Sequence, residues 1–574
     1  MKKRLLALAL CLVLALSLAA CGVSNDGGGQ TGDPGASGAS GTSGTSETSG
    51  ASGGSAPIAV SENEVVYGNA NSAAVKHDKV VVALRSDPQD LTPVNVNVDG
   101  KEVLDSIYER LYNINGFGGE LYGVLAKEMP VEVDSKTFDI EIYDDIYDSD
   151  GNNITASDVA FSINYFVNSG YAQNFNKFER IEVVGDYTVR LHTNAPLDEL
   201  SDYANVFGVL YIWSEKAMQD HNFATDPCGT GPYICTYFRS GSGLTLEASD
   251  HYWAEGTDHQ NSRSCANVQT IEYQVIGEQS QNAVALRTGT INYTTNLTDT
   301  DKANFMEGGQ YSAGFSSFSW PSNLTYHILP NCDPASICAD ENLRLAIMYA
   351  IDINMILAVA DVASAQIASD MANSKFGGYN DAWANQGDFY TYDRAANLAK
   401  AKEYLAQSSY SGEPVTLLYT SDNLTENIVQ AIQLALDEAG ITVVLDPQSF
   451  AVKDERLQDT GAWDLNVDMM ASDDYLVVVY ERLFRDDNFS EGQGTKNYIH
   501  DDEFQRLIDV CMTQEGNTQE NLDALHDYVV AHGYGRGLFA TAESAIITED
   551  ILAVCNTYKY SVLPGGCIYA DNEW

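Results

Sequence analysis

The stretch 148–152 carries residue types that can bind a hard cation. Asp148, Asp150 and Asn152 alternate in the way that the first ligands of a calcium loop do. Such a loop also needs glycine at its sixth position and glutamate at its twelfth, where this chain has Asn153 and Val159. We therefore interpret the stretch as a hairpin turn and expect no metal there.

Cysteine is the next residue type that could do chemistry. Beyond Cys11 and Cys21, the chain has eight more: Cys228, Cys235, Cys265, Cys332, Cys338, Cys511, Cys555 and Cys567. An even number permits disulfides outside the cytoplasm, and Cys332 with Cys338 and Cys555 with Cys567 are locally plausible pairs. In a reducing environment all eight would stay as thiols. No C-x-x-C pair supports a zinc site.

The motifs of common hydrolases and nucleotide enzymes are missing from the sequence that we expect to fold. It contains no H-E-x-x-H, no G-x-S-x-G and no Walker lysine. The nine histidines are scattered, and His251 and His259 form the one close pair in the first half. A hydrolase is the leading rival class of protein, but we expect no enzymatic activity and no cofactor.

The N-terminus reads as an export signal that ends in a lipid attachment site. Three cationic residues at 2–4 precede an apolar run over 5–18, which is too short to span a bilayer. The run ends in Leu18-Ala19-Ala20-Cys21-Gly22, which resembles a bacterial lipobox. Residues 1–20 would then be removed, and Cys21 would carry diacylglyceryl and palmitate-type acyl chains. Two or more acyl chains anchor a protein stably to a membrane.

Residues 21–78 are expected to form the lipidated start of the mature chain and a tether. From Val23 to Pro57 the sequence is nearly all Gly, Ser, Thr and Ala, which predicts a flexible linker. Removal of the three signal cations changes the formal net charge from -50 to -53. This charge excludes nucleic acid as a partner. It is compatible with a cationic ligand, although acidic side chains also serve to keep a surface protein soluble and monomeric.

The region after the tether is long enough for two or three lobes, because single cores stop growing near roughly 300 residues. It alternates strand-like runs with amphipathic helices, which indicates an α/β fold. One βαβ unit is predicted from a strand at 415–419, a helix that ends at Gly440, and a strand at 441–445. Another strand has Phe138, Ile140 and Ile142 facing inward, and a capping box at 155–158 follows it.

A series of short motifs occurs in a recognisable order along the folded region. They read DPQDLTP at 87–93, IYERL at 107–111, LA at 125–126, DG at 150–151 with TASDVAFS at 155–162, GTGPY at 229–233, YW at 252–253, ALRTG at 285–289, RLA at 344–346 with AID at 350–352, YD at 392–393 with AKA at 399–401, and EAGI at 438–441. This series resembles the peptide/nickel-binding family of extracellular solute-binding proteins, the dipeptide- and oligopeptide-binding receptors of ABC importers. Ser157 stands where the family usually has glutamate.

The resemblance implies a periplasmic-binding-protein-like α/β fold of the type II, peptide-binding class, with three lobes and a hinge. Lobe I would span 79–320, with lobe II inserted at about 119–195; lobe III would span 321–545, and 546–574 would return to lobe I. The ligand would be enclosed between lobes I and III when the hinge closes. It implies a small-molecule ligand, a short peptide above all, and an ABC permease as partner.

The resemblance also suggests ligand-binding residues. In peptide-binding relatives an aspartate after a Trp-Asp-Leu-type strand receives the ligand's α-ammonium group. Here that strand includes 463–465, Asp473 falls at the matching position and Asp474 lies beside it. An acidic surface loop is the alternative. Met469 and Met470 stand where an aromatic residue or glycine often precedes this aspartate.

Five further residues lie in segments that reach the cleft in the family. Trp320, Tyr326 and Asn331 occupy the crossing between the first and third lobes, where Asn331 could brace the backbone. Core packing is the alternative for Tyr326. Tyr379 and Trp383 follow a Gly-Gly loop. The expected function is ligand capture at the extracytoplasmic membrane face, and a surface peptide-signal receptor or adhesin with the same fold is the alternative.

Overall fold

The computed structural model describes residues 71–94, 100–114, 121–169, 175, 177–200, 202–360, 365–374, 376–471, 475–485, 497–555 and 562–574, which all belong to one compact unit. Cys21 and residues 22–70 of the expected tether lie outside these residues. Of the tether's last residues, Ala73 is buried and His77 already begins a strand, so the folded region starts before the expected boundary at 78. Among the described helices, none is by itself long and apolar enough to cross a membrane. The helices α8 (Glu341–Ala350) and α9 (Ile353–Ala360) meet that criterion only as a pair, which bends by 53°.

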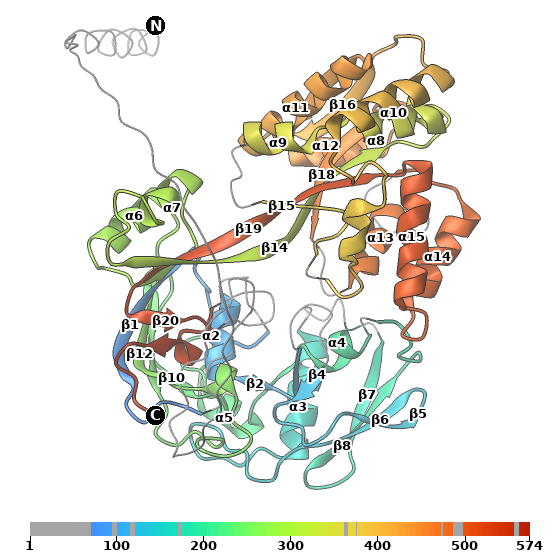
Figure 1. Cartoon of the computed structure of the whole chain (residues 1–574). Helices are drawn as coiled ribbons and strands as arrows, with labels where there is room; N and C mark the ends of the chain where they lie inside the picture. Colours follow the sequence, from blue (N-terminus) through green and yellow to red (C-terminus); the bar gives the residue numbers. More distant parts are fainter. Residues whose placement is uncertain are drawn as a thin grey trace, which may run out of the picture. The chain divides into compact units, whose positions relative to one another are not determined.

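An 11-stranded mixed sheet runs through both halves of the chain (Figure 1). Its order is β10-β11-β12-β1-β13-β19-β14-β18-β16-β17, with β15 beside β19. The strands are β1 (His77–Leu84), β10 (Tyr233–Arg239), β11 (Gly243–Ala248), β12 (Val268–Val275), β13 (Tyr293–Thr294), β14 (Phe315–Pro330), β15 (Gln366–Ile367), β16 (Val415–Thr420), β17 (Val443–Gln448), β18 (Leu465–Ala471) and β19 (Arg536–Thr548).

Two long strands connect the halves of this sheet. β14 has 16 residues and β19 has 13, and they pair antiparallel from Phe315 with Thr548 to Ile328 with Arg536 (Figure 1). At one end β19 pairs with β13, and at the other β14 pairs with β18. The register shifts between Pro321 and Thr325, where a proline cannot donate a ladder hydrogen bond. The ladder is therefore interrupted midway between the two halves.

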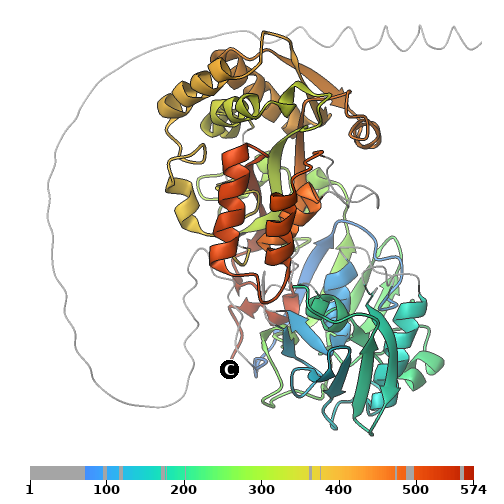
Figure 2. The ribbon, with the colours of Figure 1, turned by 90° about the vertical axis from the view of Figure 1, so that its right-hand side faces the viewer.

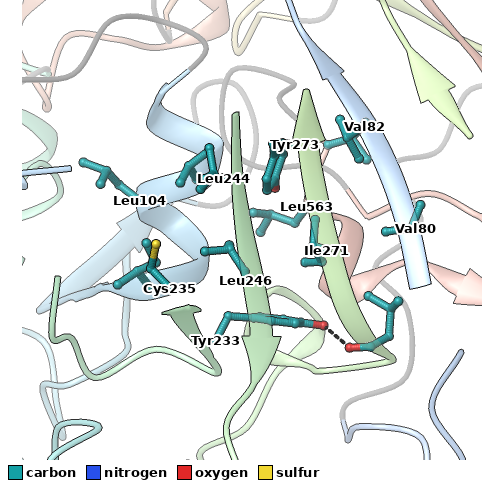
Figure 3. Close-up of a cluster of buried hydrophobic side chains, with 14 of the residues drawn as sticks. Val80, Val82, Leu104, Tyr233, Cys235, Leu244, Leu246, Ile271, Tyr273 and Leu563 are labelled. Atoms are coloured by element: carbon teal, nitrogen blue, oxygen red, sulfur yellow. Dashed lines mark hydrogen bonds between the residues drawn. The ribbon is translucent and has the colours of Figure 1, made fainter. Parts of the chain in front are cut away.

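The first half of the chain contains two main cores. One packs β1, β10, β11 and β12 against α2 (Gly100–Ile107), and Tyr233 in its interior donates to the Val268 carbonyl at 2.8 Å (Figure 3). The other packs the four-stranded sheet β5-β6-β8-β7 against α3. Its elements are β5 (Val131–Asp134), β6 (Thr137–Glu141), α3 (Ala156–Asn168), β7 (Phe178–Val183) and β8 (Thr188–Thr193).

Short elements complete this half. They are β2 (Glu109–Arg110), β3 (Tyr112–Ile114), β4 (Leu121–Gly123), α4 (Asp202–Phe207), β9 (Tyr211–Ile212), α5 (Glu215–Asp220), α6 (Gln279–Arg287), α7 (Asp299–Phe305), β20 (Ile551–Ala553) and β21 (Ile568–Tyr569). β20, β21 and the residues after 562 contribute side chains to the first core. The C-terminal segment thus returns to the part of the fold where the described chain begins.

The second half is built on β16, β17 and β18 and on two helical clusters. Its helices are α8, α9, α10 (Arg394–Gln407), α11 (Asn423–Ala439), α12 (Phe450–Arg456), α13 (Leu476–Phe484), α14 (Asp502–Met512) and α15 (Gln519–His532). One core lies under α8, α9 and α11, and another lies among α13, α14 and α15. α14 and α15 lie side by side (Figure 2). The ring of Phe504 in α14 stacks on the ring of Tyr528 in α15.

Local predictions agree well with these elements. β16, α11 and β17 form the predicted βαβ unit with parallel strands, and Gly440 ends α11 in the left-handed region at φ 97°. The second strand begins at Val443, two residues later than expected. Phe138, Ile140 and Ile142 are buried, and the Asp158 carboxylate accepts from the N–H of Thr155 at the start of α3. The two predicted cysteine pairs are not formed, because all eight cysteines are free thiols.

Candidate functional site

A buried carboxylate in β2 links two of the motifs that carried the family resemblance. Glu109 is 7% exposed, and its two oxygens accept from the Tyr252 hydroxyl at 2.6 Å and from Trp253 Nε1 at 2.7 Å. Burial is the main cause that raises the pKa of Glu109 to about 7, against the lowering effect of these hydrogen bonds. Residues about 140 positions apart in sequence therefore form one polar cluster.

The GTGPY motif meets the same part of the fold through its glycines. The Gly231 N–H donates to the Ile107 carbonyl at 2.8 Å. A Cβ atom on Gly229 would lie 2.1 Å from that carbonyl oxygen, and one on Gly231 would lie 2.7 Å from the Ser106 oxygen. Only glycine permits so close an approach of two backbones. Three motifs of the resemblance thus hold one another in place.

A small polar cavity lies beside this junction. Asp105 pairs with Arg110 at 2.5 Å and accepts from the Tyr211 hydroxyl at 2.7 Å, and Arg263 also lines the space. The cavity has a volume of about 30 Å³, which suits one or two waters but not a peptide. The cluster around Glu109 therefore supports the fold and is not a solute site in this conformation.

The segment that carries the expected ammonium anchor lies between β18 and α13. Asp473 and Asp474 both fall outside the described residues, so their roles stay predictions. β18 pairs antiparallel with β14 and parallel with β16, so the strand that precedes this segment lies beside the long strand β14. Trp320 lies in β14 opposite Glu543, but its side chain is also outside what the structure describes.

Tyr326 and the neighbouring His327 both lie inside the second half. Tyr326 is buried and stacks on Phe539 with 5.0 Å between ring centroids, which supports the packing alternative. No local sequence pattern singles out His327, which is fully buried, with Nε2 hydrogen-bonded to the Met371 carbonyl. Burial lowers the pKa of His327 to about 4.

Asn331 braces the backbone as we expected. Its side chain is fully buried, and Nδ2 donates to the carbonyl oxygens of Thr460 at 2.8 Å and Trp463 at 2.9 Å. Its Oδ1 accepts from the Asp333 N–H at 3.0 Å. Asn331 thus ties the end of β14 to the loop that precedes β18. Contact between Asn331 and a ligand stays a prediction.

Tyr379 and Trp383 pack against the helical cluster. Trp383 is fully buried, stacks on His526 with ring centroids 4.3 Å apart, and donates from Nε1 to Asp523 at 3.0 Å. The Tyr379 hydroxyl accepts from the Ser369 N–H at 3.1 Å. The ring of Trp383 has no surface open to a ligand in this conformation, so its contacts define a packing role.

Behind Trp383 lies a buried acid and imidazole pair that sequence reasoning missed. His526 Nδ1 is 2.6 Å from Asp370 Oδ2, which also accepts from the Tyr480 hydroxyl. Asp370 is fully buried and His526 is 1% exposed. Such a pair could orient a hydrolytic base, but here it is closed to solvent. Asp370 lies 156 residues from His526 and 110 residues from Tyr480 in the sequence, so no local motif could reveal the pair.

The sheet topology, the two long connecting strands and the cores in each half define the class of an α/β solute-binding protein. A family model described as "Bacterial extracellular solute-binding proteins, family 5 Middle" matches residues 120–483. The chain belongs to this family.

Curated relatives and solved structures agree with this assignment. The oligopeptide-binding protein OppA of Bacillus subtilis is 21% identical over 493 residues, which cover 76% of this chain and 82% of OppA. The dipeptide-binding protein DppE of the same organism is 22% identical, covering 66% of this chain and 72% of DppE. The unliganded open form of the periplasmic murein tripeptide-binding protein MppA superposes with a TM-score of 0.70 at 16% identity, covering 84% of this chain and 95% of MppA. A structure described as a nickel ABC transporter from Bacillus halodurans gives 0.69 at 17% identity, covering 86% and 100%.

Proposed function

We propose that this protein captures a short peptide outside the cytoplasm and delivers it to an ABC importer permease. The membership in family 5 of the solute-binding proteins carries the proposal. Curated relatives that align over most of their length are named for binding oligopeptides and dipeptides, which favours a peptide as the solute. Cys21 would hold the mature chain on the membrane through its acyl chains, and the protein would work as a monomer.

The long strands β14 and β19 would serve as the hinge. They pair with each other between the two halves of the sheet, and their ladder is interrupted next to Pro321. A strand pair with missing hydrogen bonds bends more readily there than along its regular parts. The ligand would favour the closed state through contacts that exist only in that state, and the permease would recognise this state.

Recognition of a peptide would combine main-chain hydrogen bonds with one charged anchor. Main-chain pairing leaves side-chain selectivity broad, as in strand addition. Asp473 would receive the α-ammonium group of the peptide, because a cation that leaves water needs a paired carboxylate. Asp474 would be the alternative anchor, and Trp320 and Tyr379 would contribute to the wall.

The test begins with the solute that the purified protein retains. Native and denatured masses are compared, and the released material is identified by mass spectrometry. A ladder of short peptides is expected. A single compound without a peptide backbone would contradict the peptide proposal while leaving the family assignment intact.

Variants then locate the anchor by calorimetric titration with a mixture of the released peptides. Asp473→Ala should weaken binding about 10- to 100-fold, since hydrogen bonds to charged groups contribute about 1.5–3 kcal/mol. Asp474→Ala tests the neighbouring carboxylate, and Asp437→Ala, an exposed acid on α11, is the control. If Asp473→Ala and Asp474→Ala bind the peptides as tightly as the control Asp437→Ala does, neither aspartate is the ammonium anchor. Cys21→Ala should shift the protein from the membrane fraction to the medium.

A further inference from the structure

Three side chains with different donor atoms meet where the two cores of the first half adjoin. Asp150 lies in the turn between β6 and α3, His221 directly follows α5, and Cys228 lies in the segment before β10. One ligand atom from each side chain falls within 4.8 Å of the other two. His221 Nε2 is 2.7 Å from Asp150 Oδ2. A carboxylate, an imidazole and a thiol thus converge on one point.

The imidazole is held from its other side. His221 Nδ1 lies 2.8 Å from Oδ2 of Asp226, so Nε2 is directed toward Asp150. Histidines that bind metals commonly donate their second ring N–H to a carboxylate, which orients the ring and raises its basicity as a ligand. The contact between His221 and Asp226 is a second observation, independent of the three-residue cluster, and it is typical of a histidine that binds a metal.

The turn that presents Asp150 is built independently of any ion. The Asp148 carboxylate accepts from the backbone N–H of Asp150 at 3.0 Å and of Asn152 at 2.8 Å, and Asn152 Nδ2 occupies its other oxygen at 2.9 Å. The bridge between Tyr147 and Asn153 confirms the predicted hairpin. Asp148 is therefore used by the turn, and the stretch 148–152 does not form a calcium loop.

The turn is also docked onto the segment that carries the thiol. The Ser149 N–H donates to the Gly229 carbonyl at 3.0 Å, and the Ser149 hydroxyl lies 3.3 Å from Cys228 Sγ. Gly229 is in turn fixed against Ile107 by the close approach described above. The three donors therefore sit on backbone segments whose positions other contacts already determine.

We propose that Asp150, His221 and Cys228 form a binding site for Zn²⁺, with water as the fourth ligand. A set of one oxygen, one nitrogen and one sulfur suits a borderline cation and not Ca²⁺ or Mg²⁺, which take oxygen ligands. Tetrahedral zinc at about 2.0–2.3 Å from each donor requires donor atoms about 3.3–3.8 Å apart. The Asp150 side chain is partly exposed and can move away from His221 to admit the ion.

The position of the site indicates what the ion does. Asp150 belongs to the turn between Ile146 and Ile154, which are buried in the core of the four-stranded sheet. Cys228 and Phe223 are buried in the core around β1 and β10. Zinc would join the two cores and stabilise their junction. This role is separate from solute capture and does not depend on the proposed function.

Metal binding is tested on the purified protein after removal of metals with a chelator. Competition against a chromogenic zinc indicator should give one Zn²⁺ per chain. Asp150→Asn, His221→Gln and Cys228→Ser should each weaken this site at least tenfold, and Asp226→Asn should weaken it about tenfold through the ring orientation. Cys235→Ser is the matched control, because Cys235 is a buried thiol of the same core but lies outside the cluster (Figure 3).

Cobalt substitution reports directly on the sulfur ligand. The Co²⁺ form should show a thiolate-to-cobalt charge-transfer band that Cys228→Ser removes and Cys235→Ser retains. Zn²⁺ should also raise the Tm of the wild type but not that of Asp150→Asn. This substitution lies at an exposed position in the turn, so we expect the variant to fold normally. The proposal is overturned if Zn²⁺ does not bind, if no charge-transfer band appears, or if Asp150→Asn and Cys228→Ser bind zinc as the wild type does.

Discussion

The junction around Glu109 and the region around Asn331 use their polar residues in different ways. At Glu109, residues from three family motifs bond to one another or pack backbone against backbone, and the space between them fits only water. Around Asn331, the described side chains brace β14 and β18, while the expected anchor lies in the connection that follows β18. The comparison indicates that the recognisable motifs around Glu109 support the fold, whereas the proposed anchor Asp473 lies outside these motifs.

Each region also buries a titratable group whose pKa is shifted, the carboxyl of Glu109 in one and the imidazole of His327 in the other. Burial raises the pKa of Glu109 to about 7 and lowers the pKa of His327 to about 4. Each shift favours the neutral form, since a buried charge is costly. The stability of the two regions should therefore respond to pH in opposite directions.

The largest effect is expected where two backbones touch. Gly229→Ala would place a Cβ 2.1 Å from the Ile107 oxygen, so the two segments must separate. We expect a loss of about 3–5 kcal/mol in the free energy of unfolding, measured by urea denaturation. Gly185→Ala, whose Cβ would make only ordinary contacts at 3.5 Å, is the control. A loss below about 1 kcal/mol for Gly229→Ala would show that the motif does not serve as a close-packed junction.

Glu109 should make the protein less stable as the pH rises. Its folded pKa of about 7 lies above the ordinary pKa of 4.5 for a glutamate, so its favourable contribution is complete below pH 4.5 and is lost as the pH rises toward 7. Glu109→Gln should remove this slope, which amounts to about 3 kcal/mol at most. Unfolding free energies across this pH range measure it. Glu179→Gln, at an exposed position in β7, should retain the slope.

His327 should act in the opposite direction. Its folded pKa of about 4 lies below the ordinary pKa of 6.5 for a histidine, so its contribution is present above pH 6.5 and is lost as the pH falls toward 4. The effect should be about as large as at Glu109, although the Met371 carbonyl, Asp468 and Asp370 favour the protonated imidazole. His327→Gln should flatten the acid limb of the same stability profile. An unchanged acid limb would mean that other groups dominate it.

The smallest effect is expected at Trp383, where a packing role can be distinguished from a role in solute binding. Trp383→Phe removes the hydrogen bond to Asp523 and part of the stacking on His526. We expect a stability loss of about 1–2 kcal/mol with solute affinity changed less than about twofold. Tyr379→Phe removes the acceptor for the Ser369 N–H, and its stability and solute affinity are measured in the same way. If Trp383→Phe lost much of its solute affinity while its stability stayed normal, Trp383 would belong to the binding site.

Local sequence patterns predicted the elements better than the site. The alternation of Phe138, Ile140 and Ile142 and the cap at Gly440 were read correctly, because each depends on residues a few positions apart. The order of the motifs also identified the family. The pairs Cys332 with Cys338 and Cys555 with Cys567 were chosen by proximity in sequence, and the structure holds these residues as free thiols.

The sequence by itself predicted an export signal, and it determined the alternation of strands and helices and the family to which the chain belongs. Only the tertiary structure decided which distant polar groups meet: Glu109 with Trp253, Asp370 with His526, and Asp150 with His221. The reason is physical. Helix caps and hydrophobic periodicity act within a few residues, whereas these contacts join side chains 71 to 156 positions apart, which only the packing of separate segments brings together.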